Sequence, residues 1–172
     1  DSGAELKRVD LPLPAGASVT SIGEDQPGHP LVAVGLSNGQ ALVFRHTYKV
    51  SYPDGKKTIT PAIEYPYGET PIALNESGGA LEHVSLNATD STLMLVGSTG
   101  SQLNVLSLTS EENMMTGEVT NEQKRIDLPQ MTEPVKNIFV DPRQQWLYVV
   151  NGRAQADVFS LRDKSLNGRY KL

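Results

Sequence analysis

The stretch Lys7-Arg8-Val9-Asp10-Leu11-Pro12 decides the fold of this chain, because it returns almost unchanged as Lys124-Arg125-Ile126-Asp127-Leu128-Pro129. Each copy leads into a β-rich stretch, and a third such stretch lies between the two copies. Self-similarity at a period of roughly 55–60 residues indicates stacked copies of one small structural unit. Repeat scaffolds mostly present surfaces to partners, so the pattern favours an interaction module over an enzyme.

The composition limits the classes of function. A chain of 172 residues, 38% of them hydrophobic, suffices for one β domain whose polar residues alternate outward. The formal net charge of −5 argues against nucleic acid as a partner, since binding a phosphate backbone requires clustered Lys and Arg. The absence of cysteine excludes disulfides, thiolate metal sites and cysteine nucleophiles. Because the chain begins Asp-Ser-Gly and has no signal-peptide pattern, we expect it to be a fragment of a longer protein.

Three strands of each unit can be superposed in sequence. The first strands alternate in polarity, the second are almost continuously apolar, and the third share the pattern Gln, apolar, any, Val, then Phe or Leu. Continuous apolarity predicts second strands that are buried on both faces, with Leu31, Leu93 and Leu147 at equivalent positions. The strands are expected at residues 18–22, 31–35 and 40–44 in the first unit, 81–86, 93–97 and 102–106 in the second, and 135–140, 147–151 and 155–159 in the third.

Fourth strands are expected after longer excursions. In the first unit Pro53-Asp54-Gly55-Lys56 indicates a tight hairpin turn that leads into residues 58–65. In the second, the polar stretch 111–122 is expected to loop out before residues 123–128 return as a strand. Residues 5–12 would supply a leading outer strand, and the third unit would end without a fourth strand.

These strands predict an all-β fold, a partial β-propeller of the WD40 or Tyr-Val-Thr-Asn type with about three four-stranded antiparallel blades. The single domain would span residues 1–172, with an outer strand at 5–12, blades at 13–66 and 80–129, and an incomplete blade at 134–172. Because about four blades are the smallest closed ring, three blades leave two sheet faces uncovered. We expect them to belong to a larger ring in the natural protein, with a homodimer as the alternative for the fragment.

No arrangement of titratable residues predicts an active site. His29, His46 and His83 fall at different positions in their units and lack the short spacing of a metal site, which favours structural or solvent-exposed roles. Asp10 and Asp127 recur at equivalent positions, as residues that stabilise a repeat do. We therefore predict no catalytic, cofactor-binding or metal-binding residues, and the sequence leaves the binding surface open.

Other polar motifs have simple structural interpretations. The carboxylate pairs Glu24-Asp25 and Glu111-Glu112 are expected on the solvated surface. The pairs Lys7-Arg8 and Lys124-Arg125 would protect edge strands against association, with anion binding as the minor alternative. The remaining motifs are the turn Gly97–Gly100, the glycosylation sequons at Asn75 and Asn87, which arise by chance in such a chain, and Trp146 and Tyr148, which are expected to pack in the core.

One weak resemblance concerns the third unit alone. The run Leu147-Tyr148-Val149-Val150-Asn151, followed by Val158-Phe159, is similar to the Tyr-Val-Thr-Asn repeat of bacterial propellers, including surface-layer and lactonase-like proteins. Val150 departs from the Thr of that repeat. This resemblance implies the rival hypothesis of a lactonase-like propeller enzyme with a divalent metal.

A second resemblance covers nearly the whole chain. It is carried by Leu36–Gln40, Tyr48–Ser51, Glu64-Tyr65-Pro66-Tyr67-Gly68-Glu69, Ala80–Val84, Asp141–Val149 and Leu166–Arg169. These runs resemble the long extramembrane insert in the large form of the phosphate ABC-transporter permease of some Gram-negative bacteria. The resemblance implies an inner-membrane protein whose insert projects into the periplasm as a non-catalytic accessory domain. Its implied partners are the remainder of the permease, the partner permease subunit and the periplasmic phosphate-binding protein.

Overall fold

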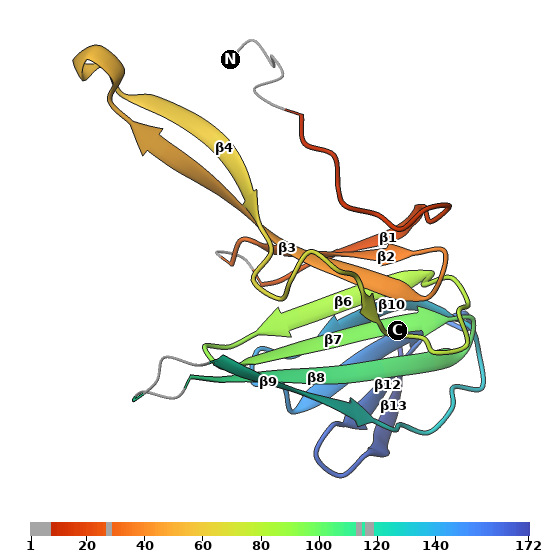
Figure 1. Cartoon of the computed structure of the whole chain (residues 1–172). Coiled ribbons are helices and arrows are strands. Elements are labelled where there is room, and N and C mark those ends of the chain that lie inside the picture. The colour runs from red at the N-terminus through yellow and green to blue at the C-terminus, as the bar shows by residue number, and fades with distance from the viewer. Residues whose placement is uncertain (1–7, 27–28, 113–114, 116–118) are drawn as a thin grey trace.

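The chain folds into β-strands only, apart from one short 3₁₀ turn, in the part that the structure describes. The structure is a computed structural model and describes residues 8–26, 29–112, 115 and 119–172. Its strands form three antiparallel sheets, each with a path of four neighbouring strands (Figure 1). The expectation of an all-β fold with three four-stranded antiparallel sheets is therefore confirmed.

The first sheet contains a long hairpin, formed by its third and fourth strands. Its path is β1 (Val19–Glu24), β2 (Leu31–Leu36), β3 (Gln40–Ser51) and β4 (Thr58–Glu64), and the short strand β5 (Ile72–Ala73) also pairs with β3. The turn between β3 and β4 is the 3₁₀ segment Pro53–Gly55, as the sequence predicts. Asp54 and Gly55 adopt positive φ values of 52° and 78° there, a conformation that suits a Gly in a tight turn.

The second and third sheets repeat the same meander. The second consists of β6 (His83–Ala88), β7 (Thr92–Thr99), β8 (Gln102–Glu112) and β9 (Val119–Ile126). The third consists of β10 (Val135–Val140), β11 (Trp146–Asn151), β12 (Gln155–Ser160) and β13 (Ser165–Lys171). Neighbouring strands along the chain pair with each other throughout, so each sheet closes locally before the next one begins.

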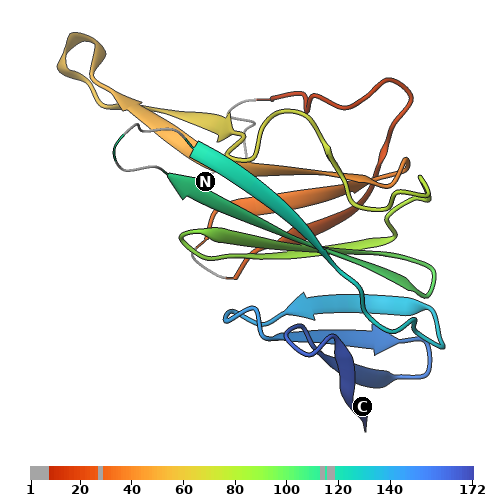
Figure 2. The same ribbon diagram turned by 60° about the horizontal axis from the view of Figure 1, so that its bottom comes forward.

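The three sheets stack face to face in chain order, as the turned view in Figure 2 shows. Strand β6 lies against β1 and β2 of the first sheet and also against β10 of the third. One apolar cluster, with Ala33, Val43, Leu95 and Leu106, fills the space between the first two sheets. A second cluster, with Val96, Val105, Leu147 and Phe159, fills the space between the second and third sheets. The second sheet is therefore covered on both faces.

Three expectations about the fourth strands were wrong. Residues 8–12 do not form a strand, and residues 5–7 lie outside the described residues. The third sheet is complete, because residues 165–171 form β13. Instead of looping out, residues 111–112 and 119–122 belong to β8 and β9, which pair as far as Glu112 and Val119. Strands made largely of polar residues are easily mistaken for loops.

The two copies of the repeated hexapeptide still play related parts. Leu11 packs on the outer face of the first sheet, against the cluster of Val34, Leu36 and Leu42. Leu128 packs against the cluster between the second and third sheets. Each leucine thus comes before a sheet in the chain and packs on the N-terminal face of that sheet, which is the outer face for the first sheet and the face towards the second sheet for the third.

The expected alignment of the second strands was wrong by one residue in the first unit. Leu31 and Ala33 face the second sheet, whereas Leu93 and Leu95 face back towards the first. The third strands do agree, since Val43 faces forward to the second sheet and Val105 faces forward to the third. Between the first and second sheets, turn length explains the difference, whereas in the third sheet Leu147 lies one residue closer to its turn than Leu31 does. The turn between strands two and three has three residues in the first and third sheets and two in the second, and a shift of one residue exchanges the faces of a strand.

Candidate functional site

One buried carboxylate lies where the first and second sheets meet. The side chain of Asp25 is fully buried, which contradicts its expected place on the solvated surface. One of its oxygens, Oδ1, accepts hydrogen bonds from the amide of Gln26 at 2.7 Å and from Nδ2 of Asn87 at 3.1 Å, and Oδ2 accepts one from the amide of Ala88 at 3.1 Å. Asp25 therefore connects the end of β1 to the end of β6.

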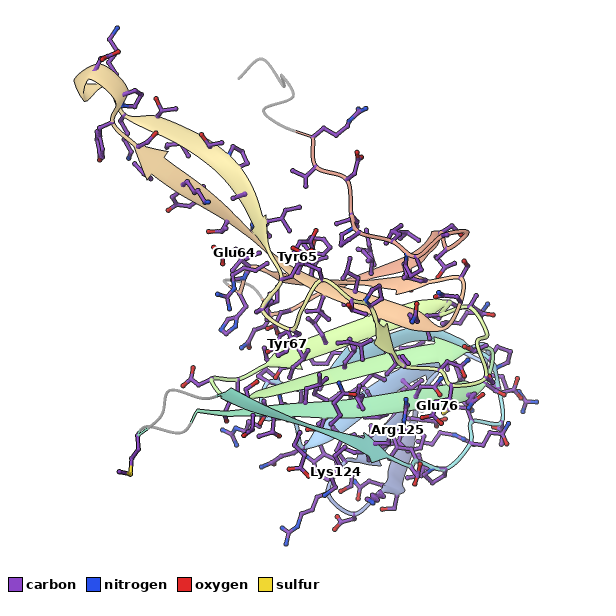
Figure 3. All side chains as sticks on the ribbon, viewed as in Figure 1. Glu64, Tyr65, Tyr67, Glu76, Lys124 and Arg125 are labelled. Atoms are coloured by element: carbon purple, nitrogen blue, oxygen red, sulfur yellow. The ribbon has the colours of Figure 1, made fainter. Side chains whose placement is uncertain are left out.

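A polar hollow of about 350 Å³ opens beside Asp25. Arg45, Tyr67 and His29 line it, and Nδ1 of His29 lies 3.5 Å from Oδ2 of Asp25 (Figure 3 labels Tyr67). Burial raises the pKa of the Tyr67 phenol, with Arg45 lowering it and Asp25 raising it further. The lining combines the cationic Arg45 and the phenol of Tyr67 with the carboxylate of Asp90, and Asp25 is already bonded within the fold.

The three histidines lie in different surroundings. His46 lines a smaller hollow together with Glu24, Asp25 and His29, residues that the sequence does not show to be neighbours. His83 lies in β6 and is partly buried. Even so, the described residues contain no group of three His, Asp or Glu side chains placed to hold a metal ion.

Arg125, from the repeated hexapeptide, fastens the fourth strand of the second sheet. Its guanidinium donates to the carbonyl oxygen of Leu74 at 2.8 Å and to that of Ala73 at 2.7 Å, and Nε lies 2.9 Å from Oε1 of Glu76 (Figure 3). These three contacts use three of the five N–H donors of the guanidinium and make Arg125 a structural clamp. Lys124 is exposed, as an edge-strand lysine should be.

The two recurrent aspartates are not inside fourth strands. Asp10 and Asp127 are exposed, and neither lies in a strand. Asp141, which the repeat does not single out, does cap a turn, because its Oδ1 accepts hydrogen bonds from the amides of Arg143 and Gln145. The recurrence of Asp10 and Asp127 thus has no shared hydrogen-bonding role that the structure explains.

One buried ion pair was missed by the sequence analysis. Asp157 is fully buried in β12, and Arg169 of β13 binds both of its carboxylate oxygens, at 2.5 Å and 3.1 Å. This hydrogen bonding raises the pKa of the Arg169 guanidinium. The available signal was a single acidic residue in the otherwise apolar third strand of the third unit, since charged groups are seldom buried without a partner.

Both glycosylation sequons fall on buried asparagines. Asn75 is 3% exposed and bonds Thr99 and the carbonyl oxygen of Gly79, and Asn87 is 2% exposed. A buried asparagine cannot carry a bulky surface glycan, so these sequons are the structural coincidences that the sequence analysis expected.

The outer face of the third sheet presents apolar and aromatic side chains that no other described sheet covers. It is formed by Trp146, Tyr148, Ala156, Val158 and Tyr170, around a shallow hollow of about 350 Å³. Tyr148 is 37% exposed and Tyr170 57% exposed, and the rings of Phe139 and Tyr148 lie 6.0 Å apart. The expectation that Trp146 and Tyr148 pack in the core was wrong, because no further sheet covers this face.

The comparisons with known proteins give no family for this chain. No protein-family model and no curated protein matches it. Among solved structures, it is similar to AztD of Citrobacter koseri, at 12% identity and a TM-score of 0.45, over 90% of this chain and 33% of that one. The chain thus spans a third of the length of that neighbour, and a likeness at this level carries no argument about function. Within the described residues, no helix is long and apolar enough to cross a membrane.

Proposed function

We propose that this chain is a non-catalytic interaction domain of a phosphate ABC-transporter permease, built from three consecutive blades of a β-propeller. The stacking of the sheets in chain order, with β1, β6 and β10 adjacent, supports the propeller interpretation. The consistent orientation of Val43, Val105 and Val158 on forward-facing sides of their sheets also supports it.

The observation that carries an interaction role is the outer face of the third sheet. Positions Val43 and Val105, which face forward in the first two sheets, are buried against the next sheet. The equivalent Val158 lies on a face where Tyr148 and Tyr170 are exposed. Large exposed aromatic patches mark sites of association, so this face is a docking surface.

The particular system comes from the sequence resemblance alone. It implies that the domain lies in the periplasm, attached to an inner-membrane permease. There it would bind the permease core, the partner permease subunit or the periplasmic phosphate-binding protein. The buried carboxylates of Asp25 and Asp157 and the guanidinium of Arg125 are bonded within the fold, which fits a role without catalysis.

A pull-down tests this proposal directly. The immobilised chain is incubated at low salt with purified phosphate-binding protein and, separately, with the detergent-solubilised permease pair. We expect one of them to be retained, and we expect the variant Tyr148→Glu with Tyr170→Glu to lose the retention. The matched control Tyr48→Glu, at an exposed tyrosine of the first sheet, should keep it. Failure of both intact partners to bind would contradict the proposal.

A further inference from the structure

The hairpin of β3 and β4 extends well beyond the sheet to which it belongs. Figures 1 and 2 both show its tip projecting away from the three stacked sheets. We call residues 47–62 of this hairpin the arm. The pairing of β3 with β4 continues along the arm to Ser51 and Thr58, so its two strands hold a regular register up to the turn.

The register places apolar side chains on one face of the arm. Val50 pairs directly with Ile59, and Tyr48 lies two residues before Val50 on the same side of β3. Tyr52 follows two residues after Val50, at the end of the strand. All four side chains are exposed, by 66% for Tyr48, 42% for Val50, 65% for Tyr52 and 56% for Ile59. A two-stranded hairpin gains little stability in water, so an arm with an uncovered apolar face points to a partner.

The charge of the arm is opposite to that of the chain. Lys49, Lys56 and Lys57 face only one acidic residue, Asp54, which leaves the arm with a formal charge of +2 in a chain of −5. These charged residues are exposed, and Lys56 and Lys57 follow the turn directly. The arm therefore combines a basic tip with an adjacent apolar face.

We propose that the arm binds the surface of an anionic lipid bilayer. Tyrosine side chains favour the boundary between headgroups and acyl chains, where the phenol stays hydrated and the ring is buried. Val50 and Ile59 would enter the apolar layer beside them, and the lysines would reach lipid phosphates, as in other interfacial amphipathic segments. This inference rests on the arm alone and does not depend on the proposed function.

Two features favour lipid over a protein partner. The arm offers 16 residues, and a stable protein interface commonly uses roughly 20–30 on each side. Its tip also protrudes beyond the other elements, so a flat surface can reach it without touching the sheets (Figure 1). A bilayer meets both conditions, because it needs only a shallow apolar contact and a local positive charge.

Co-sedimentation with vesicles tests the inference on the whole chain. We expect retention on vesicles of phosphatidylcholine with phosphatidylglycerol, little retention on phosphatidylcholine alone, and weakening at high salt. Lys56→Glu with Lys57→Glu should reduce partitioning at least about tenfold. The matched control, Lys136→Glu with Lys171→Glu on the third sheet, makes the same charge change and should keep binding close to that of the unmodified chain.

A second pair of variants isolates the apolar contribution at constant charge. Tyr48→Ser with Tyr52→Ser should weaken binding to the anionic vesicles, whereas the single Tyr170→Ser on the third sheet should not. Unchanged thermal unfolding of the arm variants shows that they are folded. Absence of vesicle binding, or an equal loss in the control variants, would overturn the inference. So would an arm that binds no vesicles but is required for a second copy or a protein partner to bind.

Discussion

Asp25 shows how one residue can connect two sheets that are otherwise held together by apolar contact. Its buried carboxylate accepts three hydrogen bonds, two of them from residues of β6. The neighbouring Asn87 keeps its own Oδ1 buried without a hydrogen-bond partner. Asp25 therefore supplies the hydrogen-bond acceptor for buried N–H groups at this end of the interface between the first and second sheets.

Removal of this carboxylate should be costly. We expect Asp25→Ala to lower the free energy of unfolding by roughly 2–4 kcal/mol, because it leaves the buried amide of Ala88 and the side chain of Asn87 without an acceptor. Urea unfolding measures the change. The adjacent Glu24→Ala, at an exposed residue of β1, is the matched control and should change stability by less than about 0.5 kcal/mol. An equal effect of the two substitutions would contradict the role given to Asp25.

Tyr67 makes the free energy of unfolding depend on pH in the alkaline range. Its pKa in the folded chain is raised above the ordinary value of 10.0, chiefly by burial, and that of Tyr65 is raised by burial and by Glu69. The unfolded chain therefore loses these protons before the folded chain does. Stability is fully present below pH 10 and falls as the pH rises from there through the folded pKa values. We expect Tyr67→Phe to make this fall shallower in urea unfolding between pH 8 and 11, with Tyr48→Phe as the exposed control.

At the scale of the elements, β9 is held in place by Arg125, a residue of the repeated hexapeptide. Arg125 joins this strand to residues 73–76, which lead into the second sheet. We expect Arg125→Ala to cost about 1–2 kcal/mol, mostly through the two hydrogen bonds to carbonyl oxygens, since the contact with the exposed Glu76 adds little. Thermal unfolding measures the loss. The neighbouring Lys124→Ala should be close to neutral, and a reversed order of the two variants would contradict the clamp.

The contact of β1 with β6 leaves no room for a side chain at Gly23. A Cβ built there would lie 2.4 Å from the carbonyl oxygen of Val84, which is backbone and cannot rotate away. We expect Gly23→Ala to force the first two sheets apart and to destabilise the chain by about 2–3 kcal/mol. In the control Gly152→Ala the nearest atom is 3.8 Å away, so that variant should unfold like the unmodified chain in urea.

At the scale of the whole molecule, the stacked sheets end in one covered and one uncovered face. Residues Leu11, Leu13 and Tyr65 cover the outer side of the first sheet, but Tyr148 and Tyr170 remain exposed on the third. We expect the isolated chain to dimerise at high concentration through the third sheet, and light scattering to show a rise in molar mass with concentration. Tyr148→Glu should abolish that rise, and Tyr48→Glu on the arm should not. A strictly monomeric chain would show that this face is stable without cover.

Much of the fold could be predicted, because its signals are local. Alternating or continuous apolar runs identified the place of every first, second and third strand, although β3 and β8 extend beyond the expected 40–44 and 102–106, and Pro53-Asp54-Gly55 identified the turn of the arm. Most fourth strands were harder to place, since β13 and the outer halves of β8 and β9 are largely polar and lack an apolar pattern. The burial of Asp25 and Asp157 could not be predicted, because their partners, Asn87 and Arg169, are neighbours only after folding.

The sequence by itself determined that this chain is a β-repeat with three units, since hydrophobic period and turn residues act over a few positions of the chain. Only the tertiary structure decided which face of each strand is inside. Leu31 and Leu93 occupy matching places in nearly identical strands, yet they point to each other across one interface. When a strand is apolar on both faces, its sequence does not show which face points to which neighbouring sheet. One residue more or less in a turn exchanges the two faces. For the same reason, the exposed face of the third sheet became visible only when the sheets were stacked.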